Sequence, residues 1–274
     1  MMLCRMLGRL FWAAACLAML APVIYAILSS LKGKGEFYQT AWWALPAKPL
    51  VGNYVTAFDK IHFFELTMNS LVISTGTVAG VLVLSSMAAF ALAFFRGALL
   101  EVIGTGLVVF LMVPLAVGIV PLLLFSAQIG WLDSPFALWG PYIAFNLPFS
   151  IYLLKAYYEK LPVEVLEAAT VDGASFFQVY GRIVVPMGTP MLATLAAIVF
   201  VKIWGEFALA LALLPNPKWW TLGVGIFNYA EMLKGYSMPE MLAAAVLGIV
   251  PSLIAFILCQ KALFSVSLSG AVKG

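Results

Sequence analysis

The chain has 274 residues, of which 64% are hydrophobic and only 10% are charged, and its formal net charge is +3. A soluble domain usually carries about a quarter charged residues, so this composition excludes an ordinary water-soluble protein and indicates a chain solvated by lipid. The small net charge, without a run of Lys or Arg, gives no indication of nucleic-acid binding. Cys4, Cys16 and Cys259 all fall in or beside apolar segments, which does not predict a disulfide framework.

Six apolar stretches are long enough to cross a membrane as helices, for which about 20 residues are needed. They cover residues 10–31, 69–95, 102–125, 135–156, 186–213 and 241–263. Helices satisfy their backbone hydrogen bonds internally, as lipid requires, so we expect an all-α integral membrane protein with one transmembrane domain over residues 1–274. The first stretch continues well beyond Cys16, which predicts an uncleaved span and not a signal peptide.

The basic residues predict how the chain lies in the membrane. Six spans place both termini on one side, together with the turn at Arg96 and the loop over residues 157–185. This side holds all four arginines of the chain, namely Arg5, Arg9, Arg96 and Arg182. Because basic residues favour the cytoplasmic side of a membrane, we expect a multi-pass protein with both termini and the 157–185 loop in the cytoplasm.

Two of the expected spans contain residues that shape helices. Gly76 and Gly80 in the second span form a small-xxx-small pair, which is typical of a close contact between helices. Pro114 in the third span would free a backbone carbonyl and kink the helix. Such a kink can serve packing alone, or it can open a polar patch along a path through the membrane.

The loop over residues 157–185 predicts two short helices around a turn. Pro162 suits a first helical position, and Glu164 and Glu167 lie near the positive end of that helix. Asp172-Gly173 breaks the helix, since glycine tolerates the left-handed conformation of a sharp turn.

The second helix of the loop begins at a recognisable cap. Ser175 and Gln178, three residues apart, match a capping box. The first helix also has a small apolar face at Val165, Leu166 and Ala169, which would fit a groove in a partner protein. From the residues alone, a well-capped linker is an equally good explanation.

The same loop resembles a known family. Glu167-Ala168-Ala169, then Asp172-Gly173-Ala174, Ile183, Val185-Pro186 and Pro190 are similar to the signature loop of type I ABC-importer permeases. In that family the loop docks into a cytoplasmic ATPase. The resemblance therefore implies that the chain is coupled to an ATPase through a set of loop residues: Glu164, Glu167, Ala168, Ala169, Asp172, Gly173 and Ala174.

Further segments resemble the carbohydrate, maltose-type branch of these permeases, and in particular its smaller membrane component. They are Ser30-Leu31-Lys32 with Glu36, Asn53-Tyr54, Asn69-Ser70 and the tail over residues 269–274. This implies a subunit of the bacterial inner membrane that imports a sugar or sugar-like solute. The implied partners are an ATPase dimer that binds ATP and Mg, a second and different permease chain, and an extracytoplasmic substrate-binding protein. In this branch the tail reaches towards the ATPase.

Polar residues inside expected spans are costly and usually face a bundle or a water-filled path. Lys202 and Glu206 are four residues apart, which predicts one helical face, with Trp204 pointing nearly the opposite way. These three residues and Asn146 are our candidates for the solute path, where Tyr142, Phe145 and Phe149 could stack on a sugar ring. A self-neutralising ion pair and ordinary packing are the alternatives. The carbohydrate branch commonly has Asn where this chain has Gly205.

No motif in the sequence predicts catalysis. It contains no G-x-x-x-x-G-K-[ST] nucleotide loop, no nucleophile elbow and no H-E-x-x-H, so the chain is not expected to be an enzyme, to hold a metal or to bind a cofactor itself. The single histidine, His62, has no partners for a metal site. The alternative functions are an ion-coupled secondary transporter that uses Lys202 and Glu206, and a membrane assembly partner that transports nothing.

Overall fold

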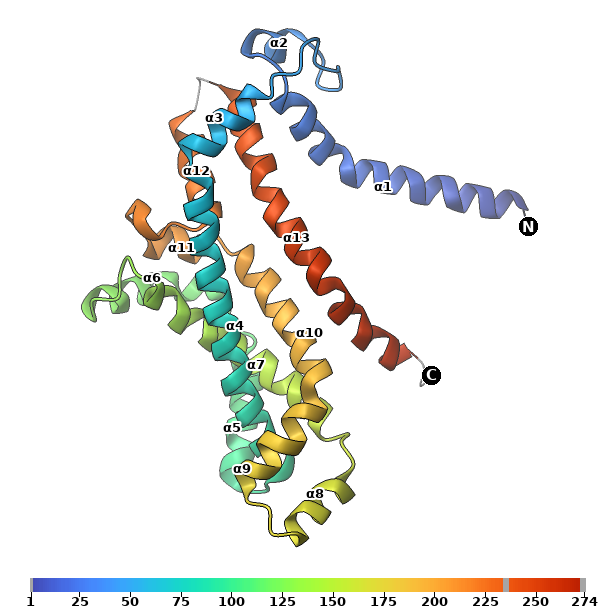
Figure 1. Cartoon of the computed structure of the whole chain (residues 1–274), viewed down its shortest axis with the longest axis vertical. Helices are drawn as coiled ribbons and strands as arrows, with labels where there is room; N and C mark the ends of the chain where they lie inside the picture. Colours follow the sequence, from blue (N-terminus) through green and yellow to red (C-terminus); the bar gives the residue numbers. More distant parts are fainter. Residues whose placement is uncertain (1, 234–236, 272–274) are drawn as a thin grey trace. The chain divides into compact units, whose positions relative to one another are not determined.

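The computed structural model describes residues 2–233 and 237–271, and every regular element in these ranges is helical, which confirms the all-α prediction (Figure 1). The chain divides into two compact units, Met1–Thr67 with Leu222–Pro251 and Met68–Thr221 with Ser252–Gly274. The elements, in chain order, are α1 (Met2–Ser30), α2 (Lys34–Gln39), α3 (Gly52–Lys60), α4 (Phe63–Phe94), α5 (Ala98–Phe110), α6 (Leu115–Gln128), α7 (Pro135–Tyr158), α8 (Val163–Val171), α9 (Phe176–Val179), the π-helix η1 (Tyr180–Val184), α10 (Val185–Trp204), α11 (Ala208–Leu213), the 3₁₀ helix η2 (Pro217–Trp219), α12 (Leu222–Met232) and α13 (Met238–Ala271).

In the first unit, hydrogen bonds tie the end of α1 to α3. Asn53 donates from Nδ2 to the backbone carbonyls of Ser30 and Lys32, at 2.7 and 3.0 Å, and the hydroxyls of Ser30 and Tyr54 share a hydrogen bond. The side chain of Lys32 is buried, and its Nζ donates to the Thr40 hydroxyl at 3.1 Å. Buried polar groups need such partners. The Ser30, Lys32 and Asn53-Tyr54 pattern of the sequence therefore fixes the fold of this loop.

The start of α4, α12 and the start of α13 also pack closely in the first unit. A Cβ added at Gly225 would lie 2.1 Å from Cδ1 of Leu66, so a larger residue there would have to displace the Leu66 side chain. Tyr229 donates to Glu240 at 3.4 Å. Burial, followed by the Glu240 carboxylate, raises the pKa of Tyr229 to about 12, so this hydroxyl keeps its proton at neutral pH.

In the second unit, α4 and α7 meet at the predicted glycine pair. A Cβ added at Gly76 would lie 2.5 Å from Nε1 of Trp139, and one added at Gly80 would lie 2.4 Å from Cδ1 of Ile143. The Trp139 indole N–H donates to the carbonyl of Ile73 at 3.1 Å. The two glycines thus serve a close helix contact, as their spacing predicts.

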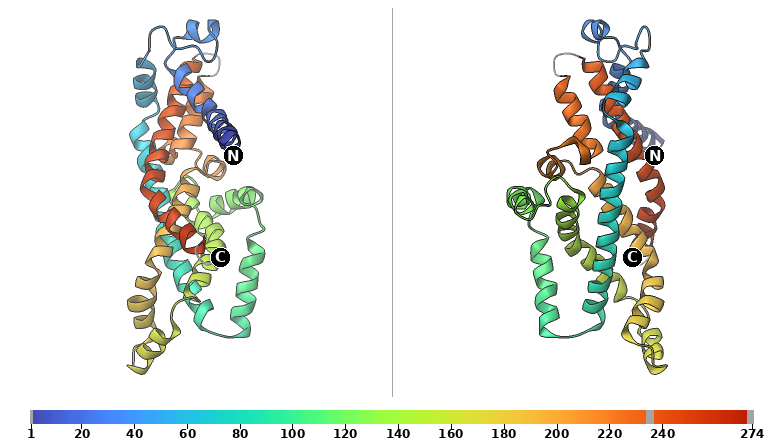
Figure 2. Two further views of the ribbon diagram at one scale, coloured as in Figure 1. Left: turned by 90° about the vertical axis from the view of Figure 1, so that its right-hand side faces the viewer. Right: turned by 60° about the vertical axis from the view of Figure 1, so that its left-hand side comes forward.

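The expected third span, residues 102–125, is not one continuous helix. α5 and α6 meet at a bend of 103°, and Figure 2 shows α6 running across the end of α5. Pro114 precedes α6 in an extended conformation, with φ −73° and ψ 138°. Proline lacks an N–H and disfavours a helical conformation in the residue before it. The kink lies where the sequence predicts it, but it breaks the helix and does not merely bend it.

The expected fifth span, residues 186–213, also differs from the structure. One apolar helix runs over Phe176–Trp204 through α9, η1 and α10. Within it the N–H of Val185 donates to the carbonyl of Tyr180, five residues back, which defines the π turn. The helix ends at Trp204, with Gly205 as its C-cap, and α11 is a separate helix. The helix therefore begins before the expected stretch and ends within it.

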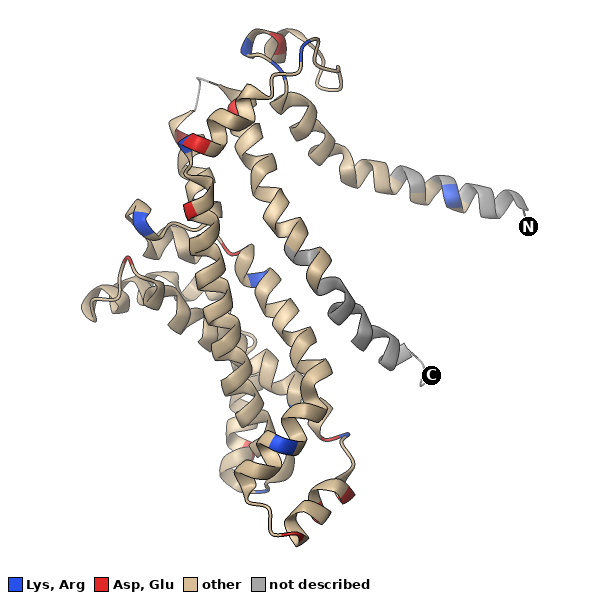
Figure 3. Ribbon diagram, viewed as in Figure 1, with Lys and Arg blue, Asp and Glu red and all other residues tan. Residues whose placement is uncertain are grey.

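Three helices of the described part are long and apolar enough to cross a membrane, and the bent pair would be a fourth. They are Phe63–Phe94, Pro135–Tyr158 and Phe176–Trp204, and few charged residues interrupt them (Figure 3). Two shorter apolar helices, Ala15–Ser30 and Met238–Ile254, lie where the first and sixth spans are expected. The count of six spans stays a prediction. The side chains of the 269–274 tail, and the fold of residues 272–274, lie outside the described part.

Candidate functional site

The 157–185 loop folds as two short helices around a glycine turn. Pro162 lies immediately before α8, at its N-cap, and not at the first helical position that the sequence predicts. At the other end Gly173 has a φ of +81°, and the successive N–H groups of residues 172–174 donate to carbonyls of the last turn of α8. Ser175 and Gln178 form the predicted capping box of α9. The shape of the loop therefore comes from its own backbone and caps.

The outward face of the loop is both apolar and acidic. Leu166 is buried and anchors α8, whereas Val171 and Phe177 are 86% and 73% exposed. Of the residues expected to couple to an ATPase, Ala169 and Ala174 are half-buried and the others are exposed: Glu164, Glu167, Ala168, Asp172 and Gly173. These residues share one short loop, and their role in coupling stays a prediction.

Aromatic rings connect this loop to α4. The Phe176 ring lies 4.7 Å from that of Phe90 and 5.0 Å from that of Phe95, measured between centroids. The Tyr180 ring lies 5.3 Å from Phe90, and its hydroxyl donates to Ser86 at 3.1 Å. Stacked and tilted aromatic pairs add to the free energy of burial. A displacement of α9 would therefore act directly on α4 through these contacts.

The same junction reaches α7 and α10 through Tyr158. Its hydroxyl shares a 2.8 Å hydrogen bond with the Ser86 hydroxyl, and the side chain is fully buried. A Cβ at Gly188, in the first turn of α10, would lie 2.7 Å from Cε1 of Tyr158. Three long helices and the loop thus converge on Ser86 and Tyr158.

A cavity of about 370 Å³ lies among α5, α6, α7 and α10. Its lining is mostly apolar, with a few polar groups: Phe110, Leu111, Val113, Leu115, Tyr142, Phe145, Asn146, Phe149, Lys202, Ile203 and Glu206. Three of the four candidates for the solute path, Asn146, Lys202 and Glu206, line it. Trp204 is not among the lining residues and stacks on Phe200, with ring centroids 5.6 Å apart. The role of these residues in transport stays a prediction.

Glu206 is held by hydrogen bonds on several sides. Its carboxylate accepts from the backbone N–H groups of Leu209 at 2.9 Å and Ala210 at 3.3 Å, at the start of α11. It also accepts a hydrogen bond from the hydroxyl of Tyr142, a buried residue of α7. A carboxylate at a helix N-terminus satisfies N–H groups that have no partner within the helix. Glu206 therefore caps α11 and attaches it to α7.

The four-residue spacing predicts that Lys202 and Glu206 share a helical face, and this prediction is wrong. The helix α10 ends at Trp204, between the two residues. Among the described residues the ion pairs are Lys60–Glu240 and Lys155–Glu159, so Lys202 and Glu206 do not neutralise each other. The Lys202 ammonium has no hydrogen-bond or ion-pair partner in this part of the chain. The cavity therefore contains one engaged carboxylate and one cation without a counter-charge.

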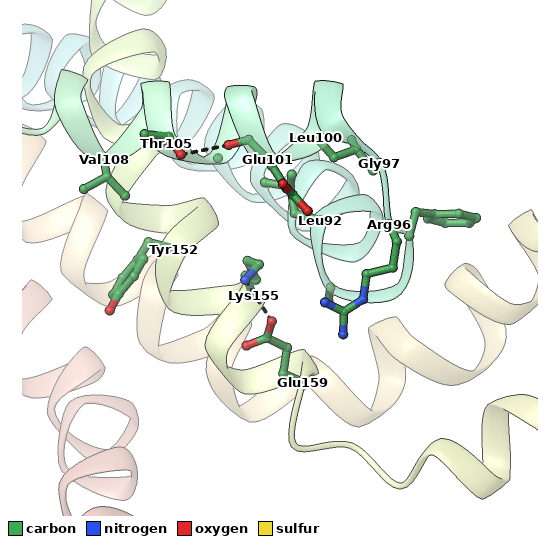
Figure 4. A pocket seen from close by; sticks show the side chains of 13 residues that line it. Leu92, Arg96, Gly97, Leu100, Glu101, Thr105, Val108, Tyr152, Lys155 and Glu159 are labelled. Carbon is green, nitrogen blue, oxygen red and sulfur yellow. Dashed lines mark hydrogen bonds and ion pairs between the residues drawn. The ribbon is translucent and has the colours of Figure 1, made fainter.

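A second cavity, of about 500 Å³, lies between the α4–α5 turn and the end of α7. Figure 4 shows the charged ends of Arg96, Glu101, Lys155 and Glu159 around the same opening. Lys155 and Glu159 form an ion pair of 2.8 Å, one helical turn apart. Cations and carboxylates occur here in equal number, so this cavity has no clear preference for the sign of a ligand's charge.

The sequence did not indicate the hydrogen bond from Tyr142 to Glu206, since these residues are 64 positions apart. One signal was available: Tyr142 and Asn146 are four residues apart in α7 and so lie on one face. The Nδ2 of Asn146 indeed donates to the carbonyl of Tyr142 at 2.7 Å. The spacing identifies the shared face, whereas only the tertiary structure identifies the acceptor.

Long apolar helices, a cavity among them and an exposed two-helix loop define the class of the chain as a helical membrane protein. Residues 81–264 match the family described as binding-protein-dependent transport system inner membrane component, and the chain belongs to this family. Its members include ABC-transporter permeases of carbohydrates, in agreement with the resemblance of the loop.

Several relatives match along nearly the whole chain. A putative ABC transporter permease protein, ORF2, of Caldicellulosiruptor sp. is 33% identical over 92% of this chain and 91% of its own length. The trehalose/maltose transport system permease protein MalG of Thermococcus litoralis is 31% identical over 98% of this chain and 95% of its own. The sulfoquinovosyl glycerol transport system permease protein SmoH of Agrobacterium fabrum is 31% identical over 93% and 89%.

A solved structure has the same fold. A chain of a bacterial ABC transporter involved in the import of the acidic polysaccharide alginate matches with a TM-score of 0.80, covering 94% of this chain and 96% of its own, at 24% identity. The break between α5 and α6 and the separate α11 therefore occur within an architecture known for importer permeases.

Proposed function

We propose that this chain is the permease subunit of an ATP-driven importer of a sugar or sugar-like solute in the bacterial inner membrane. The observation that carries the proposal is the exposed α8–Gly173–α9 loop, whose apolar and acidic face has no partner within the described chain. Relatives that transport trehalose and maltose, galactooligosaccharides and diacetylchitobiose support a sugar as the solute.

ATP and Mg are bound by a partner ATPase dimer in this proposal, since the chain has no nucleotide loop. The 157–185 loop docks on that ATPase in the cytoplasm, where both termini also lie. A second, different permease chain completes the path, and an extracytoplasmic binding protein delivers the solute. Alternating access is then a shift between two packings of the helices, biased by nucleotide.

The contacts of α9 supply a route for the coupling. Closure of the ATPase dimer carries the loop with it, and Phe176 and Tyr180 press on Phe90 and Ser86 of α4. Tyr158 passes the displacement to α7 and, through Gly188, to α10. Both of these helices line the 370 Å³ cavity. Movement at the loop thus reaches the cavity through packed side chains, without a long flexible connection.

The ion-coupled alternative has less support. It needs Glu206 to exchange protons or ions with the path, but the Glu206 carboxylate is engaged by Tyr142 and by the N-terminus of α11. The family to which the chain belongs is that of binding-protein-dependent systems. We therefore retain the importer as the proposed function.

The test is to purify the tagged chain from cells that express its complete native operon, and to identify the co-purifying proteins by mass spectrometry. Gly173→Arg places a bulky cation on the docking loop. Gly130→Arg is the matched control, because Gly130 also has a positive φ, of +73°, and neither glycine has an atom within 4 Å of an added Cβ. Both variants carry the same kind of backbone strain, on different loops.

We expect the wild type and Gly130→Arg to retain an ATPase and a second permease, and Gly173→Arg to lose the ATPase while keeping the permease. If the wild type brings down no ATPase, or if Gly173→Arg retains it as well as the control does, the loop is not the coupling element.

A further inference from the structure

The two charged side chains of the 370 Å³ cavity differ in how far their charges are already satisfied. It contains one acidic and one basic side chain, Glu206 and Lys202, but they are not in the same situation. The negative charge of Glu206 is already met by three donors, which are the Tyr142 hydroxyl and two backbone N–H groups at the positive end of α11. The carboxylate thus has little capacity left to balance another charge.

Lys202 is the opposite case. It lies in the last turn of an apolar helix and lines the cavity, and no group of the described chain accepts a hydrogen bond from its ammonium. An unpaired charge within a span is costly, and such residues are usually paired or placed in a path. The partial negative charge at the C-terminus of α10 offsets part of this cost, but a helix end carries only about half a charge.

The other polar side chain with free hydrogen-bonding capacity, Asn146, is neutral. Asn146 uses one amide hydrogen on the carbonyl of Tyr142 and keeps a second, together with its side-chain oxygen. Phe110, Phe145 and Phe149 supply flat apolar faces on which a sugar ring can lie. The cavity therefore offers aromatic walls, one amide and one free cation.

From this arrangement we propose that the imported solute is an anionic sugar, which carries a carboxylate, sulfonate or phosphate group, and that Lys202 balances its charge in the cavity. The inference rests on the proposed function, because it names the class of solute for the same importer. An ammonium without a counter-charge attracts an anionic group, whereas a neutral sugar gives it no such Coulombic attraction.

The experiment uses the complete importer in proteoliposomes with ATP inside and its binding protein outside. The binding protein is first screened with galacturonate, trigalacturonate, glucose 6-phosphate and 6-deoxy-6-sulfoglucose, against galactose, maltotriose and glucose. The sugar that best stimulates ATP hydrolysis is then used for uptake. We expect it to come from the anionic group, and an importer driven best by a neutral sugar would overturn the inference while leaving the proposed function intact.

The variants then test Lys202 itself. Lys202→Gln should lower uptake of the anionic sugar about tenfold, while Lys202→Arg keeps most of it, because it retains the charge. Lys218→Gln, in an exposed loop, is the control and should transport like the wild type. If Lys202→Gln transports normally, Lys202 is not the counter-charge. If it loses the second permease on purification, Lys202 pairs with a carboxylate of that chain, and the inference is equally wrong.

If the proposed function were wrong, the sugar screen would give a different result from the one that overturns the anionic class. An importer that no sugar of either group drives, although the ATPase co-purifies, would refute the sugar assignment as a whole. The screen thus separates an error about charge from an error about the class of solute.

Discussion

The α8–α9 loop and the cavity among α5, α6, α7 and α10 are built in opposite ways. The loop obtains its form from neighbours in sequence, through the Gly173 turn and the Ser175 cap, and leaves much of its surface exposed. The cavity obtains its form from residues far apart in sequence, such as Tyr142 and Glu206. A locally determined segment can present a constant shape to a partner, whereas a wall made of several helices can change when those helices move.

The largest effect on stability is expected where side chains from distant parts of the sequence pack, as they do at the contact between α4 and α7. Gly76→Leu would force a side chain into Trp139 and should destabilise the α4–α7 contact by about 3 kcal/mol, in the range of overpacked cores. Gly104→Leu in α5 is the control, since no atom lies within 4 Å of an added Cβ there. Thermal unfolding of the purified complex measures both. Equal midpoints for the two variants would mean that the glycine contact does not hold the helices together.

A smaller effect is expected at the cavity wall. Glu206→Ala leaves the buried Tyr142 hydroxyl and two N–H groups of α11 without an acceptor, which should cost about 2 kcal/mol. Glu206→Gln keeps an acceptor oxygen and should recover part of this loss. The measurement is again the unfolding midpoint. A Glu206→Ala protein as stable as the wild type would show that the carboxylate is not a structural cap, and would return it to the list of candidate solute ligands.

The smallest effect on stability is expected in the loop. Gly173→Ala places an L-residue at a φ of +81°, which costs about 1 kcal/mol, and the strain is confined to the turn. Affinity for the ATPase should fall about fivefold, since 1.4 kcal/mol corresponds to tenfold, while global unfolding barely changes. Titration of the permease complex with the purified ATPase measures this, with Gly130→Ala as control. A large fall in the unfolding midpoint would mean that the loop belongs to the core.

The sequence predicted best where the determinants are local. The all-α class, the two loop helices, the capping box at Ser175 and the close contact at Gly76 and Gly80 depend on spacing alone, and the structure contains all of them. The family followed from the loop pattern and is confirmed by the match over residues 81–264.

The errors concern helix ends inside apolar stretches. Most residues on both sides of Pro114 and of Gly205 are apolar, so the stretches 102–125 and 186–213 look continuous, although the helix is interrupted in both. Because the sequence pattern gives no sign of the break at Gly205, the four-residue spacing wrongly predicts one helical face for Lys202 and Glu206. The cap that Glu206 forms on α11 and its bond to Tyr142 depend on tertiary structure, which spacing along one helix cannot reveal.

The π turn over Tyr180–Val184 has a consequence for how this helix tolerates change. It accommodates one residue more than an α turn, so that Phe176 before it and Gly188 after it can both face their partners. In an uninterrupted α-helix that extra residue would rotate everything beyond it by about 100°. A one-residue deletion within η1 should therefore restore regular winding and preserve both contacts, whereas the same deletion further along α10 would turn Lys202 out of the cavity.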